Sequence, residues 1–326
     1  MATHNAYRQL TLVELAKRKD PDGNLATIAE VLAEDNEILQ DAIWQPSNDT
    51  FSYKVVRRSS LPTGSWRKFN EGVSIEASRT VEELETIGML ETFARNDVDL
   101  IKGFPNPTKA RMDEAISFLE GMGQTLAETM VYGNASTTPE TFTGLAPRMD
   151  ALATTTNVLD SGGSGSDLTS IFVIMWAPNK VFMTYPKGDP NIGIRHEDLG
   201  IETVEPSAGT LYRAYVDHFQ IKAGMVVKDP RCIGRISNIE TTGTSNTFDE
   251  DDIIRLLNRM PGRGKGAKIY VNDTVLTQME IRLKDKNNVN YVPGKGEGLV
   301  GEPAMYFRSN PIRLVDQILI TEAALA

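Results

Sequence analysis

The sequence predicts an α+β fold, and three stretches carry that prediction. Residues 51–78 alternate apolar and polar side chains as β-strands do, whereas residues 108–134 repeat apolar side chains three and four positions apart, as one face of a long helix does. Residues 171–325 mix short apolar runs of strand length with amphipathic stretches of helix length. The C-terminal half therefore has an α/β character within an α+β chain.

Composition bounds the class of protein. The chain has 326 residues, 40% of them hydrophobic and 24% charged, which is enough for a sizeable core in one compact body with extensions or in two domains. It contains no signal-peptide pattern and no apolar run of about eighteen residues, so we expect a soluble protein with no membrane partner. Cys232 is the only cysteine, which excludes an internal disulfide and fits a reducing compartment.

The charge balance argues against a dedicated nucleic-acid binder. The formal net charge is -10, whereas a protein that binds phosphate backbones needs a basic face to release counterions. A local basic patch is still compatible with this composition.

The N-terminal segment is expected to hold two short amphipathic helices. Thr11 is a suitable N-cap for the first, residues 20–23 break the chain, and the second covers residues 24–43. Trp44 and Pro46 end the segment. Such helices cannot bury their apolar faces alone, so they need another surface.

Residues 51–78 predict a β-hairpin with an unusual charge pattern. Alternation predicts a first strand around residues 51–55, a turn at Pro62–Gly64 and a later strand at residues 73–77. The hairpin cations are Lys54, Arg57, Arg58, Arg67 and Lys68, and the acidic residues that follow include Glu71, Glu76, Glu82, Glu83 and Glu85. A basic segment joined to an acidic one can bind a neighbouring copy head to tail and close a ring. Alternatively, the charges only keep an exposed strand edge from aggregating.

The long helix is expected within residues 108–134, and some 25 residues at about 1.5 Å each make it roughly 37 Å long. One apolar stripe is formed by Met112, Ile116, Leu119, Gly123, Leu126 and Met130. Gly121 and Gly123 each cost up to about 1 kcal/mol inside a helix, so we expect a bend or close packing there. Gly133 and Asn134 supply the stop.

The C-terminal half reads as a series of short elements. We expect a turn-rich connector at 154–170, a buried strand at 171–178, strands at 219–229 and 231–240, a helix at 249–260, a strand and helix within 267–283, and a strand and tail at 311–325. The acidic residues 249–252 suit the positive end of that helix better than a calcium loop.

Motifs for catalysis are weak, so the sequence predicts no catalytic residue, cofactor or metal ion. Residues 296–301 match G-x-G-x-x-G, but Pro293 and Pro303 break the strand and helix that this motif requires, and we favour a glycine loop. Residues 262–268 lack the spacing of a phosphate loop. His196, Glu197 and Asp198 are adjacent, which rarely suits one metal ion, so a solvated loop is the better interpretation.

The order of parts resembles a known family. Helical arm, β-hairpin, long helix and α/β region follow one another as in the major capsid proteins of tailed bacteriophages, which have the Hong Kong 97-type fold. The phrases "LTLVELAKRKDPDG", "LPTGSWRKFNEGV", "FLEGMGQTLAETMVYGN", "FTGLAPRM" and "PIRLVDQILITEAA" are similar to capsid proteins of short-tailed phages of the epsilon15 kind. The resemblance runs along nearly the whole chain.

This resemblance implies a role for each segment. Residues 1–45 would be the N-terminal arm, 46–86 the extended E-loop, 87–140 the peripheral domain with its spine helix at about 104–134, and 141–326 the axial domain with interleaved peripheral-domain strands. Some members of the fold form a Lys–Asn crosslink between subunits. Lys68 is the candidate position for it here, although the sequence identifies no partner asparagine.

The resemblance also implies the function. Copies would form hexamers and pentamers of an icosahedral head that encloses double-stranded DNA, with no catalytic turnover. The implied partners are other copies, a separate scaffolding protein, a portal, a decoration protein and DNA bound non-specifically, in a virion assembled in the host cytoplasm. An encapsulin-like container and, as the weakest alternative, a nucleotide-binding α/β enzyme are the competing interpretations.

Overall fold

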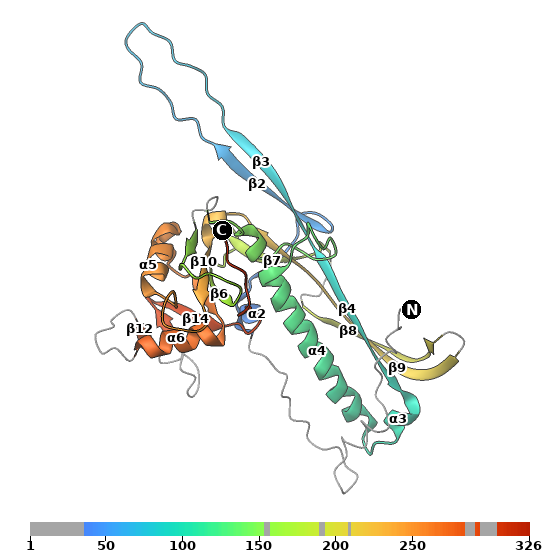
Figure 1. Cartoon of the computed structure of the whole chain (residues 1–326). Coiled ribbons are helices and arrows are strands. Elements are labelled where there is room, and N and C mark those ends of the chain that lie inside the picture. Colours follow the sequence, from blue (N-terminus) through green and yellow to red (C-terminus); the bar gives the residue numbers. More distant parts are fainter. Residues whose placement is uncertain (1–35, 153–156, 189–192, 208–209, 284–290, 294–304) are drawn as a thin grey trace, which may run out of the picture. The chain divides into compact units, whose positions relative to one another are not determined.

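The computed structural model describes residues 36–152, 157–188, 193–207, 210–283, 291–293 and 305–326. The described part of the chain divides into two compact units: unit 1 includes Met89–Leu126 and Asn191–Lys222, and unit 2 comprises Asn36–Gly88, Ala127–Pro190 and Ala223–Ala326. Figure 1 shows the elements along the chain. Most of the two expected N-terminal helices lies outside the described residues.

Unit 2 is built on a seven-stranded mixed sheet. Its strand order is β12-β13-β14-β11-β6-β10-β5. The strands are β5 (Val158–Asp160), β6 (Leu168–Ile174), β10 (Ile233–Glu240), β11 (Lys268–Val271), β12 (Tyr291–Pro293), β13 (Met305–Phe307) and β14 (Asn310–Leu314). Every residue of β6 is buried, which confirms the buried strand that the continuous apolar run predicted, although the strand ends at Ile174 and not at residue 178.

Helices and short turns complete this part of unit 2. They are α2 (Glu37–Asp41), α5 (Glu250–Arg259), α6 (Asp273–Leu283), and the 3₁₀ turns η1 (Ala146–Arg148), η2 (Pro230–Cys232) and η3 (Pro261–Gly264). The predicted helix at 249–260 is confirmed, with Asp249 as N-cap accepting from the Asp251 backbone N–H. The strand and helix expected within 267–283 are confirmed as β11 and α6.

A second, smaller set of strands in unit 2 packs against the base of the hairpin. β1 (Trp44–Pro46) pairs in parallel with β7 (Val181–Tyr185), and β7 pairs antiparallel with the end of β9 (Thr210–Val227). The hairpin strands β2 (Ser52–Ser60) and β3 (Arg79–Thr86) pair with each other as a separate two-stranded sheet. Val55 of β2 packs in a buried cluster with Phe182 and Val226, so the hairpin base belongs to the core of unit 2.

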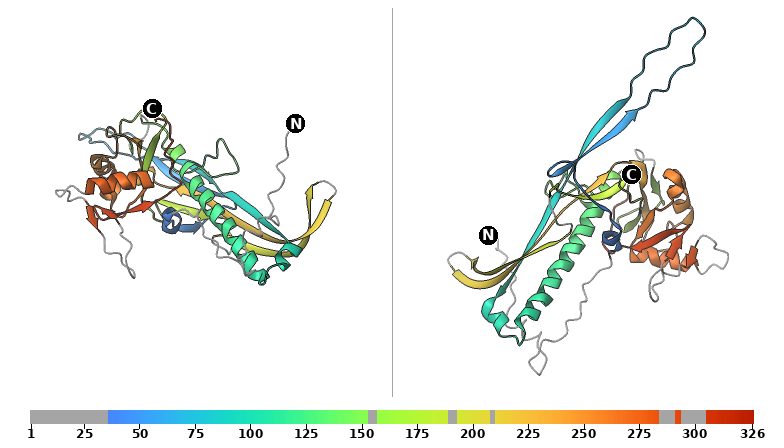
Figure 2. Two further views of the ribbon diagram at one scale, coloured as in Figure 1. Left: turned by 60° about the horizontal axis from the view of Figure 1, so that its bottom comes forward. Right: turned by 180° about the vertical axis from the view of Figure 1, so that it is seen from behind.

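Unit 1 contains one long helix beside long strands. Its elements are most of β4 (Gly88–Asp97), α3 (Val98–Lys102), the first part of α4 (Pro107–Tyr132), β8 (Arg195–Ser207) and the first part of β9. β8 and β9 form an antiparallel ladder (Figure 2). The long-helix prediction is confirmed, with the Asn106 side chain accepting from the Lys109 N–H at its start and Gly133 at its end.

Gly133 ends α4 where no larger residue fits. A Cβ atom there would lie 2.5 Å from the Thr129 carbonyl oxygen and 2.6 Å from that of Phe142. Such distances would force the backbone to shift. The predicted stop at Gly133 thus has a steric basis.

Several local predictions are wrong. The helical stripe is misplaced in the first half of α4: Met112 and Ile116 are exposed, because the helix turns Arg111 and Phe118 toward Asp217 and Phe219 of β9. The connector at 154–170 contains β5 and the start of β6. The second N-terminal helix was expected to reach residue 43, but α2 ends at Asp41 and residues 44–46 form β1.

The strand expected at 219–229 is confirmed but is longer than predicted. It begins at Thr210, and its partner β8 was not predicted at all. Residues 196–198 therefore lie on a strand and not in a solvated loop. Within the described residues, no helix is long and apolar enough to cross a membrane.

Candidate assembly surface

The β2–β3 hairpin has a fixed register that sets where its tip lies. Ser52 lies opposite Thr86 and Arg58 opposite Thr80, and this register continued outward brings the two sides together at residues 69 and 70. The chain does turn there, with Asn70 at φ 69°. The turn predicted at 62–64 and the strand predicted at 73–77 are both wrong, because register and not turn propensity decides the tip.

The base of the hairpin is held by a buried, bidentate ion pair. Arg148 donates to both carboxylate oxygens of Glu85, at 2.6 and 2.7 Å, and also to the carbonyl oxygens of Thr143, Gly144 and Met225. Both side chains are largely buried. This geometry is the strong form of a charge-assisted hydrogen bond, so β3 is fixed at its inner end.

The inner part of β2 is anchored as well. Arg57 donates to the Glu83 carboxylate at 2.6 Å and to the Lys228 carbonyl oxygen at 2.9 Å. The Tyr53 ring packs edge-on against Phe182, with ring centroids 5.3 Å apart. Lys54 forms an exposed ion pair with Glu82 at 3.3 Å. Cations and carboxylates near the base thus satisfy each other within one chain.

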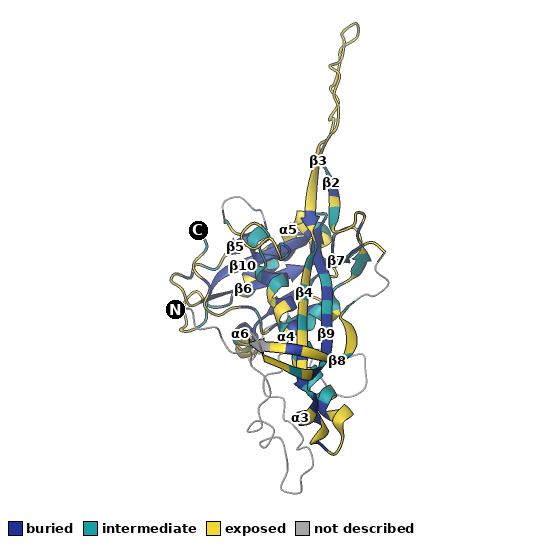
Figure 3. Cartoon of the chain, turned by 90° about the vertical axis from the view of Figure 1, so that its right-hand side faces the viewer, coloured by how far each residue is buried: buried dark blue, intermediate teal, exposed yellow. Residues whose placement is uncertain are grey.

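The distal half, residues 61–78, is different. It contains no regular strand, and the large apolar side chains Trp66, Phe69 and Ile75 are 106%, 96% and 100% exposed. Figure 3 shows the hairpin as exposed along its outer length. Large apolar side chains that are fully exposed contribute no burial energy to the fold of their own chain. This segment therefore has the character of an interaction surface.

The predicted site residues fall into two groups. Lys54, Arg57, Glu82, Glu83 and Glu85 are engaged in ion pairs of their own chain, as described above. Farther out, Glu76 accepts from the backbone N–H groups of Thr63 and Gly64, and Arg67 donates to the Glu71 carbonyl oxygen. Arg58 and Lys68 make no ion pair within the described part of the chain.

Two features of the site were missed from the sequence. Arg148 lies 63 positions from Glu85, and nothing in the local pattern around it indicates that pairing. The second feature is a groove in unit 1, between α4 and β4.

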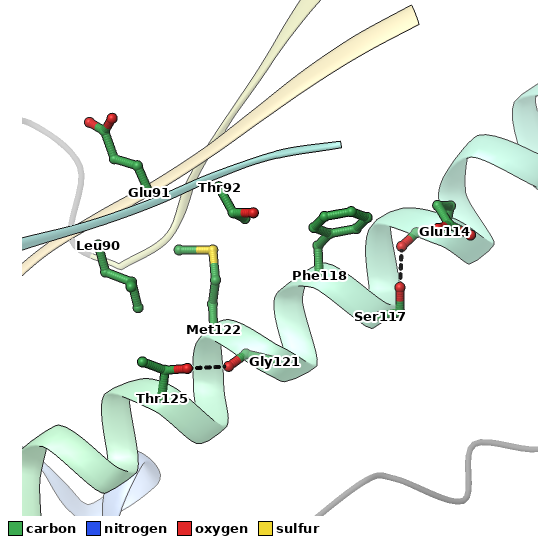
Figure 4. A pocket seen from close by; sticks show the side chains of 9 residues that line it. All are labelled: Leu90, Glu91, Thr92, Glu114, Ser117, Phe118, Gly121, Met122 and Thr125. Atoms are coloured by element: carbon green, nitrogen blue, oxygen red, sulfur yellow. Dashed lines mark hydrogen bonds between the residues drawn. The ribbon is translucent and has the colours of Figure 1, made fainter. Parts of the chain in front are cut away.

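The groove has a volume of about 450 Å³ and an apolar floor. In Figure 4 the Phe118 and Met122 side chains project from α4 toward Leu90 and Thr92 of β4. The remaining lining residues are Glu91, Glu114, Ser117, Gly121 and Thr125. The lining therefore contains two carboxylates and no cation.

Unit 1 also contains a charged cluster around Arg111. Asp198 and Asp217 lie opposite each other on β8 and β9, and Arg111 donates to both, at 2.9 and 2.8 Å. His196 Nε2 lies 3.0 Å from the same Asp217 oxygen. The cluster joins α4 to the ladder, and within the described residues no group of acidic, histidine or cysteine side chains could hold a metal ion.

Comparison with solved structures defines the class of protein. The structure of the bacteriophage Epsilon15 matches over 100% of this chain and 99% of its own, with a TM-score of 0.73 and 30% sequence identity. The fold is therefore the Hong Kong 97-type fold of phage capsid proteins, as the sequence predicted. The bacteriophage JBD30 capsid and an encapsulin from Synechococcus elongatus each give a TM-score of 0.46, at 13% and 10% identity, over 88% and 69% of this chain and 93% and 94% of their own.

The family model gives the particular identity. Residues 20–326 match the family of the major capsid protein GP7, and the chain belongs to that family. It is thus a major capsid protein of a phage head, which self-assembles into the shell and is a component of the virion. No protein with curated annotation matches the chain.

Proposed function

We propose that copies of this chain form hexamers and pentamers that close the icosahedral head around double-stranded DNA, with the hairpin laid on a neighbouring copy. The observation that carries this proposal is the contrast within the hairpin: its base is anchored in unit 2, whereas Trp66, Phe69 and Ile75 beyond it are exposed. A second copy supplies the missing surface.

In this proposal the segments divide the work as the resemblance implies. Residues 1–45 act as the arm, 46–86 as the E-loop, 87–140 as the peripheral domain and 141–326 as the axial domain with interleaved peripheral-domain strands. The hairpin cations Arg58, Arg67 and Lys68 contact carboxylates of the neighbour. Since the chain carries a net charge of -10, a neighbouring copy offers many such carboxylates.

The role is structural and involves no catalytic turnover. Assembly takes place in the host cytoplasm around a separate scaffolding protein, with a portal and a decoration protein as further partners. The acidic chain leaves packaged DNA bound only non-specifically, because a shell with a net negative charge does not retain phosphate backbones and hinder their entry.

Charge reversal at the tip tests this proposal. The variant Arg67→Glu/Lys68→Glu should lose shell formation in electron micrographs, with and without the scaffold, while its thermal unfolding stays at the wild-type temperature. Both side chains are exposed and outside the core, so folding does not depend on them.

The matched control is Lys102→Glu/Lys109→Glu, which makes the same change in net charge at two other exposed positions. It should assemble normally. Normal shells from the tip variant would remove the hairpin from its proposed role, and a wild-type chain that forms no shells would refute the assembly proposal as a whole.

A further inference from the structure

Gly121 occupies an unfavourable place for a glycine. It lies in the middle of α4, where glycine costs about 1 kcal/mol relative to alanine. A Cβ atom built at Gly121 meets nothing within 4 Å, so no close packing in the chain itself requires the missing side chain. Of the bend or close packing that the sequence predicted at this position, close packing is wrong, because the glycine faces open space.

The open space above Gly121 is the groove between α4 and β4. Its volume of about 450 Å³ lies in the range of pockets that hold small molecules, and one aromatic side chain fits in it. Leu90, Phe118 and Met122 give it an apolar floor, and Ser117 and Thr125 give it hydroxyl groups (Figure 4). An apolar floor with a few polar groups suits an amphipathic ring such as indole.

The electrostatics of the groove favour a basic occupant. Of the carboxylates on α4, Glu114 lines the groove, and α4 has no lysine or arginine between residues 112 and 132. Glu91 of β4 also borders the groove, but its side chain points away from α4 in Figure 4 and its carboxylate accepts from Gln220, so Glu114 is the carboxylate that a bound group would meet. A segment that places an aromatic ring next to cations is therefore complementary to this surface.

The hairpin tip has that chemistry. Trp66 is completely exposed and is followed directly by Arg67 and Lys68. Residues 57–70 contain four cations and no acidic residue. Phe69 is similarly exposed, but it lies in the turn itself and has no N–H group to donate.

We propose that the groove over Gly121 receives the indole ring of Trp66 from the hairpin of a second copy. This inference rests on the proposed function and adds the receiving site. The ring packs on Leu90, Phe118 and Met122, and its N–H donates to a hydroxyl oxygen of Ser117 or Thr125. Arg67 and Lys68 then lie near the Glu114 carboxylate at the edge of the groove. A large side chain at position 121 would occupy the space that the ring needs.

Two substitutions at Gly121 test the receiving site. Gly121→Ala adds one methyl group and leaves most of the groove open, whereas Gly121→Leu projects a four-carbon side chain into the space above position 121. Both replace glycine with a better helix former. Both variants should unfold at or above the wild-type temperature, so lost assembly cannot be assigned to misfolding. We expect shells from Gly121→Ala and none from Gly121→Leu, and equal assembly of the two variants would overturn the inference.

Two alanine substitutions at the tip test the occupant. Truncation of a central aromatic anchor typically weakens an interface about thirty-fold or more, so Trp66→Ala should raise the protein concentration needed for assembly by that factor. Phe69→Ala, at an equally exposed aromatic residue of the same tip, should raise it less than about three-fold. The opposite order, or two equal effects, would overturn the assignment to Trp66.

Crosslinking shows whether the contact joins two copies. The variant Ser65→Cys/Ser117→Cys places thiols beside Trp66 and in the groove, while the native Cys232 is fully buried. A short bis-maleimide should give a ladder of linked chains on a denaturing gel, whereas internally linked monomers alone would overturn the inference. A wild-type chain that assembles while all these results are negative would leave the proposed function standing and remove only this site.

Discussion

Charged residues in the interior of unit 2 and charged residues of the distal hairpin follow opposite rules. Arg235 is buried, lies over the Phe172 ring, and donates to Glu322, to Ser170 and to the Met149 carbonyl oxygen. Glu322 also accepts from the Tyr132 hydroxyl group. In contrast, Arg58 and Lys68 are exposed and make no ion pair within the described residues.

This difference separates folding from assembly. A buried charge without its partner is costly, so the network around Glu322 makes the fold of the monomer specific and fixes the C-terminal tail on β6. An exposed charge without a partner lowers the stability of the monomer very little. Such a charge can still form an ion pair with another molecule. Substitutions in the two regions should therefore have different measurable effects.

The largest effect on stability is expected at Arg235. Arg235→Ala leaves the Glu322 carboxylate buried without its cation, which should lower the free energy of unfolding by about 3–5 kcal/mol. Urea unfolding followed by circular dichroism measures this change. The double variant Arg235→Ala/Glu322→Ala should recover part of the loss, because no unpaired charge then remains. A loss below about 1 kcal/mol in the single variant would contradict the role assigned to this network.

A somewhat smaller effect is expected at Arg148, where the two regions meet. Arg148→Ala removes the bidentate pair with Glu85 and should cost about 3 kcal/mol. Hydrogen exchange should show faster opening of the base of β2 and β3, and assembly should weaken as well because the hairpin loses its fixed direction. Unchanged exchange in β3 would show that the hairpin is anchored by other contacts.

Local patterns in the sequence predicted the elements but not the long-range pairings. The apolar run at 171–178, the helix at 249–260 and the long helix each contain their own local signal, and all three elements are confirmed, the first as a strand that ends at Ile174. The Glu85–Arg148 pair and the groove over Gly121 depend on residues brought together from distant positions, which no local period encodes. The predicted apolar stripe through Met112 and Ile116 is wrong for a related reason. The residue of β9 that contacts this part of α4 is Asp217, so Arg111 faces the strand.

The resemblance to capsid proteins predicted more of the function than the residue patterns did. Charge alone left open whether the hairpin cations serve a neighbour or only protect an exposed edge. In the structure, Lys54 and Arg57 form ion pairs within the chain, whereas Arg58 and Lys68 form none within the described residues. Of these four cations, Arg58 and Lys68 are therefore the ones left for a neighbour.

The smallest expected effect is a pH dependence at Asp198. The hydrogen bond from Arg111 and one from the Gly200 N–H hold the pKa of Asp198 below its ordinary value. Because the folded pKa is the lower one, the stabilisation is complete above the ordinary value near 3.8 and is lost as the pH falls through the folded pKa. The Asp198 side chain is half exposed, so solvent screening limits its contribution to less than about 1 kcal/mol.

Unfolding free energies of the wild type and Asp198→Asn should therefore differ slightly at about pH 6 and converge as the pH falls through the lowered pKa of Asp198. A difference that persists at low pH would mean that Asp198 acts by packing and not by charge. Glu71→Gln in the distal hairpin is the matched comparison, since it removes a carboxylate to which the described part of the chain offers no cation. It should stay within about 0.5 kcal/mol of the wild type over the same range, because a charge that serves only assembly leaves the stability of the monomer unchanged.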